Sequence, residues 1–272
     1  MTGQGVQSAA DAAAWTVVVP VKSLSAAKTR LAPEHSPAER AALARAFALD
    51  TIEAARAARR VRRVVVVSDE PAIEHALRGL PGVDVVPEPA ARGLGAAIAH
   101  GIAVAAQRPP VTTVDVGLRL VQPASRAHTG NGGGVAVLLG DVPSVRSEDL
   151  DAALEAAARH PLAFVPDAED TGTTLATARA GEPFEAHFGR DSAARHAAAG
   201  FADLAAAHPD AIAARLRRDV DTAAELRAVV ALGVGPHTSA ALRALDLAEG
   251  PAPRHPLDPS TAPPGADRKA AS

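Results

Sequence analysis

Three basic side chains lie close together in the segment VPVKSLSAAKTRL at positions 19–31. Lys22, Lys28 and Arg30 follow a run of apolar residues and are separated by small residues. A lysine ammonium is a compact positive charge and an arginine guanidinium a bidentate donor, so these three cations could hold a triphosphate. The segment lacks the glycines of a Walker loop, which let backbone amides approach phosphate. A solvated turn before a helix is an equally good interpretation.

Three aspartates could hold a divalent cation. Asp141 follows the apolar run VAVLL and Gly140, and a carboxylate at the end of a strand is a ready magnesium ligand. Asp219 and Asp221 are two positions apart in LRRDVDT; in an extended segment both would point the same way, and a cation would relieve their repulsion. Each also has a structural interpretation, because Asp141 suits a turn and Asp221 or Thr222 could cap the following helix.

Two further segments could bind an anion. The segment DTGTTLATA at 170–178 predicts a turn rich in hydroxyls and amides, and HFGRDSAARH at 187–196 places Gly189 and Ser192 before a predicted helix. The unpaired N–H groups and the macrodipole of a helix N-terminus attract anions. Asp191 or Ser192 would cap this helix whatever its function. We expect His196 on the helix surface rather than at a catalytic centre.

Strands and helices must position these residues. Continuous apolar runs without alternation predict strands covered on both faces, and therefore a parallel sheet in an α/β sandwich. Ligands bind beyond the carboxyl ends of such strands, where the candidate residues stand. The sequence Ser36-Pro37-Ala38-Glu39 predicts a capping box at a helix start, Asp69-Glu70 precede a helix beginning at Pro71, and Gly79 and Gly233 are placed to end helices. The predicted strands are WTVVVPV (15–21), VVVV (64–67), VDVV (83–86), VAVLL (135–139) and LAFVP (162–166).

We expect one folded domain, residues 15–248, between two disordered tails. Residues 1–14 are small and polar, and residues 249–272 are rich in proline and small polar residues that cannot bury enough apolar area to become ordered. Within the domain, residues 107–134 carry paired prolines and a glycine-rich end, which predicts a long loop or insertion.

Composition excludes several classes of protein. The 272 residues are 47% hydrophobic, which excludes an intrinsically disordered chain. With 28 Lys+Arg against 31 Asp+Glu and no dense basic stripe, we expect no nucleic-acid partner. The absence of cysteine excludes disulfides and thiolate zinc sites. No apolar run approaches the roughly 20 residues of a membrane span, and the N-terminus is unlike a signal peptide, so we expect a soluble cytoplasmic protein.

Taken in order, six segments resemble those of the 2-phospho-L-lactate/phosphoenolpyruvate guanylyltransferases of coenzyme F-420 biosynthesis. The resemblance spans about Trp15 to Leu245 and implies a three-layer, Rossmann-like nucleotidyltransferase fold with a mostly parallel central sheet. Each segment alone is only moderately specific for this family, whereas the six in this order are strong evidence for the resemblance. They are VPVKSLSAAKTRLAP, VSDEP, LLGDVP, DTGTTL, HFGRDSAARH and DVDTAAEL.

The resemblance implies transfer of GMP from GTP to phosphoenolpyruvate, with release of pyrophosphate and use of Mg²⁺; 2-phospho-L-lactate and 3-phosphoglycerate are alternative acceptors. Asp141, Asp219 and Asp221 match the family's metal-binding aspartates. The positions that match those holding the acid are Thr173, Gly189 and Ser192, and those that match the loop near the GTP phosphates are Lys22, Lys28 and Arg30.

The chemistry agrees with this implication. The attacking oxygen would belong to a phosphate monoester, which is already largely ionised at neutral pH, so no general base is needed. Catalysis then consists of charge neutralisation and in-line positioning, for which we single out Asp141, Lys28 and Arg30. The chain departs from the family pattern at Gly95, Asp170 and Arg190. A nucleotidyltransferase acting on a sugar phosphate or molybdopterin, and a non-catalytic nucleotide-binding homologue, remain the alternatives.

Overall fold

The computed structural model describes residues 14–24, 28–32, 34–107 and 133–245. The predicted C-terminal tail, all but one residue of the N-terminal tail and most of the predicted 107–134 loop therefore lie outside the described residues. No helix in the described ranges combines the length and apolarity that crossing a membrane requires.

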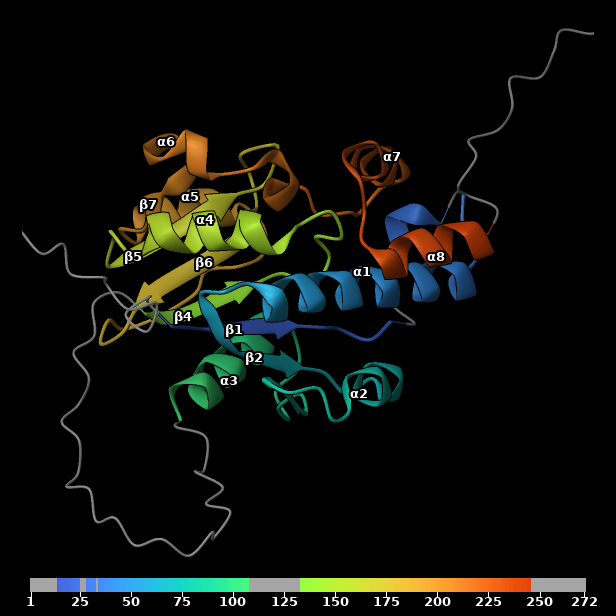
Figure 1. Cartoon of the computed structure of the whole chain (residues 1–272), viewed down its shortest axis with the longest axis horizontal. Coiled ribbons are helices and arrows are strands. Elements are labelled where there is room, and N and C mark those ends of the chain that lie inside the picture. Colours follow the sequence, from blue (N-terminus) through green and yellow to red (C-terminus); the bar gives the residue numbers. More distant parts are fainter. Residues whose placement is uncertain (1–13, 25–27, 33, 108–132, 246–272) are drawn as a thin grey trace, which may run out of the picture.

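A seven-stranded sheet forms the centre of the molecule (Figure 1), with strand order β3-β2-β1-β4-β6-β5-β7. Neighbouring strands pair in parallel except at β6, which runs antiparallel to both β4 and β5. The predicted strands and the mostly parallel sheet are thus confirmed. The strands are β1 (Trp15–Pro20), β2 (Val61–Val67), β3 (Val83–Val86), β4 (Gly134–Leu138), β5 (Leu162–Pro166), β6 (Thr173–Arg179) and β7 (Ala202–Asp203).

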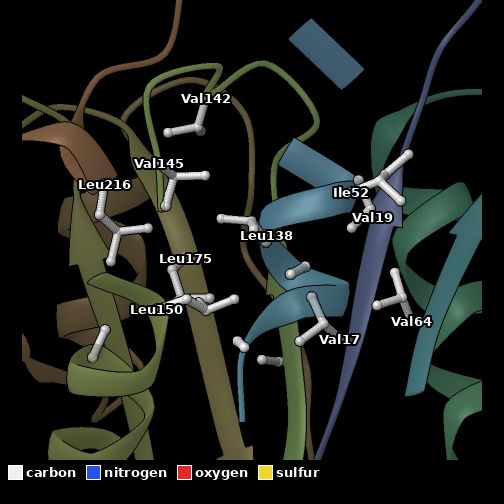
Figure 2. Packing of buried hydrophobic residues seen from close by; sticks show 14 of the residues in the cluster. Val17, Val19, Ile52, Val64, Leu138, Val142, Val145, Leu150, Leu175 and Leu216 are labelled. Carbon is white, nitrogen blue, oxygen red and sulfur yellow. The ribbon is translucent and has the colours of Figure 1, made fainter. Parts of the chain in front are cut away.

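Helices cover both faces of the sheet and make the three-layer sandwich that was predicted. Along β1, Val17 and Val19 face a core formed with α1, α2 and α4, whereas Val18 faces a second core formed with α3 and α5. Figure 2 shows the first core, in which Ile52 of α1 and Leu150 of α4 lie among strand side chains. The α-helices are α1 (Pro37–Ala57), α2 (Pro71–Leu77), α3 (Leu94–Ala106), α4 (Ser147–Ala157), α5 (Ser192–Ala198), α6 (Leu204–Ala207), α7 (Ala223–Leu232) and α8 (Pro236–Ala244). Short 3-10 helices span η2 (Thr29–Leu31), η3 (Pro209–Ala211) and η4 (Ala214–Arg217).

The predicted local signals for helix ends are confirmed. The Ser36 hydroxyl accepts a hydrogen bond from the Glu39 N–H at 3.3 Å, and the Glu39 carboxylate accepts one from the Ser36 N–H at 2.6 Å. Helix α2 begins at Pro71. Gly79 and Gly233 adopt φ values of +78° and +88° just beyond α2 and α7, a conformation that favours glycine.

The predicted turn over 170–178 is wrong beyond Gly172, because Thr173–Arg179 is strand β6. Its threonines are buried, and the Thr177 hydroxyl donates to the Ala163 carbonyl of β5 at 3.3 Å. Since a neighbouring strand satisfies these hydroxyls, a threonine-rich segment can occupy the middle of the sheet.

Candidate active site

A cavity of about 910 Å³ opens at the carboxyl ends of β1, β2 and β4. Every predicted site residue except Arg30 lines it, although these residues come from segments far apart in the chain. Arg30 lines an adjoining cavity of about 670 Å³ that shares Gly189 and Asp221 with the first. The predicted residues in the larger cavity are Lys22, Lys28, Asp141, Thr173, Gly189, Ser192, Asp219 and Asp221.

Lys28 is the charged centre of this cavity. Its side chain is only 8% exposed, and its ammonium donates to Asp141 Oδ2 at 2.6 Å and to Asp221 Oδ1 at 3.0 Å. Burial alone would lower the pKa of Lys28, yet the two carboxylates outweigh it and raise the pKa above its usual value. Arg30 is largely exposed, with its guanidinium 3.8 Å from Asp221 Oδ2. The first loop therefore contributes one buried cation, Lys28, and two exposed cations, Lys22 and Arg30.

Asp219 completes a cluster of three carboxylates. Its burial, followed by the nearby charges of Asp141 and Asp221, raises the pKa of Asp219 to about 7. The segment that carries Asp219 and Asp221 is not a strand: residues 214–217 form η4, and residues 218–221 lie outside regular secondary structure. Val220 is fully buried between the two aspartates, and its N–H donates to the Asp141 carbonyl at 3.1 Å. This hydrogen bond holds the segment of Asp219 and Asp221 beside Asp141.

The carboxylates suit a hard divalent cation. One oxygen of Asp141, Oδ1, is buried without a hydrogen-bond partner, and carboxylate oxygens are the donors that Mg²⁺ takes. Within the described ranges, no three carboxylate or imidazole groups already surround a common point. Instead, the Lys28 ammonium lies between Asp141 and Asp221. The donor set thus fits a metal ion that takes over contacts now made by Lys28.

The opposite wall of the cavity is built from turns with unusual backbone conformations. Gly189 has φ +111°, and Asp170 and Asp191 have φ values of +59° and +53°. Asp167 accepts hydrogen bonds from the backbone N–H groups of Thr171 at 2.9 Å and Gly172 at 2.7 Å, which fixes the turn that leads into β6. Non-glycine residues in the left-handed region are uncommon and tend to cluster at functional sites.

The predicted cap of α5 is wrong in one respect. Asp191 is the N-cap residue, but in its left-handed conformation its side chain makes no capping hydrogen bond. Ser192 is instead the first residue of the helix and lies almost fully buried against the cavity. The Ala193 N–H donates to the Thr171 carbonyl at 3.2 Å, so the start of α5 is tied to the turn before β6.

His196 is fully buried, which overturns the expectation of a surface position. Its Nε2 accepts a hydrogen bond from the His187 N–H at 3.0 Å, and its Nδ1 lies 3.1 Å from the Thr173 hydroxyl. Burial is the main cause that lowers the pKa of His196 to about 4. A surface position was expected for His196 because its hydrogen-bond partners are distant in sequence or belong to the backbone.

Several polar residues of the cavity were not predicted as site residues. Asp69 and Glu70 come one residue after the end of β2, and Asp167 follows β5, so the rule that singled out Asp141 would also have found them. Asp69 pairs with Arg92 and accepts a hydrogen bond from the Glu88 N–H at 2.9 Å. Glu70 accepts one from the Leu24 N–H at 2.8 Å.

The three departures from the family pattern lie around this cavity without obstructing it. Gly95 is on α3, and a Cβ built there would meet no atom within 4 Å. The Asp170 carboxylate accepts a hydrogen bond from the Arg217 guanidinium at 2.5 Å. Arg190 is 95% exposed and lines the smaller cavity.

Known proteins similar to this chain include a protein family, curated relatives and a solved structure. A family described as guanylyl transferase CofC like matches residues 15–127. A phosphoenolpyruvate guanylyltransferase from Sanguibacter keddieii is 44% identical over 267 residues, covering 87% of each chain. Another from Streptomyces avermitilis is 43% identical over 237 residues, covering 87% of this chain and 97% of that protein. The solved structure of Rv0371c from Mycobacterium tuberculosis H37Rv has a TM-score of 0.47 and 18% identity, covering 81% of this chain and 99% of that one.

Proposed function

Because the chain belongs to the family of CofC-like guanylyl transferases, we propose that it transfers GMP from GTP to the phosphate of phosphoenolpyruvate and releases pyrophosphate in coenzyme F-420 biosynthesis. The relatives' names support this choice of acceptor over 2-phospho-L-lactate and 3-phosphoglycerate. The observation that carries the proposal is one cavity in which Lys28 and three aspartates face Thr173, Gly189 and Ser192.

In the proposed reaction, a phosphate oxygen of the acid attacks the α-phosphorus of GTP. A new oxygen–phosphorus bond forms, the bond from the α-phosphorus to the bridging oxygen of the β-phosphate breaks, and pyrophosphate leaves. The attacking phosphate needs no deprotonation, since its second pKa is about 6. The main obstacle is the approach of one anion to another, which positive charge and fixed geometry overcome.

The chain's own residues divide this work. Lys22, Lys28 and Arg30 bind the triphosphate from the first loop, as their place along the cavity walls supports. Asp141, Asp219 and Asp221 would hold Mg²⁺, which when bound supplies positive charge against the phosphate oxygens. For this to happen, the Lys28 ammonium releases Asp141 and Asp221 and turns to the phosphates.

The acid is held on the other wall of the cavity. Backbone N–H groups at Thr173 and Gly189 and the hydroxyl of Ser192 donate to its oxygens. Gly189 suits this role because its φ of +111° is rarely adopted by other residues, and because the absence of a side chain lets a ligand approach its backbone.

Pyrophosphate release from the purified protein tests the proposal. GTP, ATP and CTP are each combined with phosphoenolpyruvate, 2-phospho-L-lactate, 3-phosphoglycerate and a sugar phosphate in the presence of Mg²⁺. We expect the highest kcat/KM for GTP with phosphoenolpyruvate. Higher kcat/KM with a sugar phosphate, or no release with any pair, would refute the assignment. Asp141→Asn is the control for contaminating activity, since it should lower turnover at least about a hundredfold.

A further inference from the structure

The buried imidazole of His196 has a defined proton position. A backbone N–H can only donate, so the contact from the His187 N–H at 3.0 Å requires a lone pair on His196 Nε2. The ring is uncharged near neutral pH because burial lowers its pKa to about 4. A neutral imidazole carries one proton, which must therefore lie on Nδ1.

This proton position determines the direction of the next hydrogen bond. His196 Nδ1 lies 3.1 Å from the Thr173 hydroxyl, so the hydroxyl oxygen is the acceptor. The hydroxyl keeps one proton of its own to donate. Among the residues that the structure describes, no other group is hydrogen-bonded to this hydroxyl, and Thr173 lines the larger cavity.

We propose that His196 is a positioning residue that holds the Thr173 hydroxyl as a hydrogen-bond donor toward an oxyanion of the bound phosphorylated acid. The inference rests on the proposed function, since it names the acid as the ligand that receives this bond. The Thr173 hydroxyl would add a further donor to the backbone N–H groups of Thr173 and Gly189 and the hydroxyl of Ser192. His196, which lies behind this wall of the cavity, sets the direction in which the Thr173 hydroxyl donates.

The surroundings of His196 support a fixed orientation. The ring is stacked on Phe164 with an interplanar angle of 21°, and Phe188 and Phe201 meet it edge-on at 80° and 65°. With three rings around it and both nitrogens hydrogen-bonded, the imidazole has one well-defined orientation. It therefore links the start of β6, the segment before Gly189 and helix α5, all of which line the same cavity.

Steady-state kinetics with five single variants test the role. Thr173→Val removes the hydroxyl, and we expect the KM for phosphoenolpyruvate to rise roughly tenfold to hundredfold, as for the loss of one hydrogen bond to a charged group. The KM for GTP should stay within about twofold, well below that loss. Thr173→Ser keeps the hydroxyl and should retain a KM near that of the wild type. Thr177→Val is the matched control. It removes a hydroxyl from the same strand, but this hydroxyl donates to the Ala163 carbonyl.

The variants of His196 separate positioning from packing. His196→Phe keeps an aromatic ring but loses the donor, so it should raise the KM for phosphoenolpyruvate by a similar factor. His196→Asn places an amide nitrogen near the position of Nδ1, so it should keep most of the affinity for phosphoenolpyruvate. This variant tests the role even if His196→Phe fails to fold. In the Thr173→Val background, exchanging Asn for Phe at position 196 should leave this KM unchanged.

Two results would overturn the role of His196. One is an equal rise of KM for both substrates in His196→Phe that persists in the Thr173→Val background, since this is the pattern of a purely structural residue. The other comes from ¹⁵N–¹H spectra of histidine-labelled protein at pH 7, in which the signals lost in His196→Asn identify this ring. We expect a neutral ring protonated on Nδ1, and a proton on Nε2 would refute the inference. If the wild type shows no turnover with phosphoenolpyruvate, the proposed function itself is wrong and the named ligand with it.

Discussion

Asp219→Asn should make the metal-free protein more stable while nearly abolishing its activity. In the folded protein Asp219 is partly buried beside Asp141 and Asp221, and the Lys28 ammonium offsets their repulsion only in part. Asparagine has almost the same shape and carries no charge, so it removes this repulsion without leaving a cavity. A residue whose charge opposes folding needs another role, which under the proposed function would be cation binding.

The size and sign of the effect follow from the raised pKa of Asp219, which is about 7 when folded against a usual value of 3.8. Between these values the folded state binds a proton that the unfolded state does not, so Asp219 makes stability fall as pH rises through this window. At pH 8 Asp219 is ionised in the wild type and lowers the free energy of unfolding by its full amount. Asp219→Asn should raise the free energy of unfolding by about 1–3 kcal/mol, after allowance for the partial burial of the asparagine side chain. For a domain of this size this corresponds to a Tm higher by roughly 2 to 10 °C. The gain should shrink toward pH 4.

Thermal unfolding in EDTA at pH 8 and pH 5, together with pyrophosphate release, measures both effects. Turnover should fall at least about a hundredfold, and added Mg²⁺ should raise the Tm of the wild type but not of Asp219→Asn. Asp151→Asn is a matched control of opposite sign, because Asp151 accepts hydrogen bonds from the backbone N–H groups of Arg59 at 3.1 Å and Arg60 at 2.8 Å and lies outside the cavity. It should lose stability and keep its turnover. A less stable Asp219→Asn, or one with normal turnover, would refute the reasoning.

Three further predictions concern other groups of the cavity. Lys28→Met should lower the Tm of the metal-free protein, because it leaves the carboxylates without their cation. Mn²⁺ should raise the Tm of this variant more than that of the wild type, and an equal rise would contradict competition between Lys28 and the metal. His196 is neutral when folded, with a pKa of about 4, so its contribution of up to about 3 kcal/mol is present above pH 6.5 and is lost as pH falls toward 4. His196→Asn should flatten the dependence of unfolding free energy on pH in this window, as denaturant titrations would show. Ser192→Ala should raise the KM for phosphoenolpyruvate roughly tenfold to hundredfold and leave that for GTP nearly unchanged; equal effects on both would mean that Ser192 does not contact the acid.

Local patterns predicted most of the fold because they act through neighbouring residues. The valine run of β1 predicted a strand buried on both faces, and Val18 and Val19 indeed enter opposite cores. The capping box at Ser36 needs only a residue three positions away and was confirmed in full. The carboxyl-end rule was sufficient to gather Lys22, Lys28 and Asp141 at one edge of the sheet.

The expectations that failed depend on partners far away in the chain. Strand β6 was missed because the hydroxyls of its threonines suggest a turn until neighbouring carbonyls are available to them. His196 was predicted to lie on the surface because its burial depends on the His187 N–H and on three phenylalanine rings, and no local pattern predicts these contacts. The position of Asp219 and Asp221 beside Asp141 also depends on a distant partner, because the Val220 N–H donates to the Asp141 carbonyl. Side-chain polarity thus predicts a position well only when the partner is local.

The charges of the cavity explain why its cation-binding and phosphate-binding parts must act together. With all three aspartates ionised and Lys28 charged, the centre carries a net charge of −2. The metal-free protein reduces this charge by favouring a proton on Asp219 and by keeping the Lys28 ammonium against Asp141 and Asp221. Under the proposed function, a dication bound at the carboxylates would make both unnecessary, so Asp219 would lose its proton and the Lys28 ammonium would be free to contact the triphosphate. The charge of the triphosphate would in turn favour the dication. Metal and nucleotide should therefore bind more tightly together than either does alone, because the same lysine links their sites.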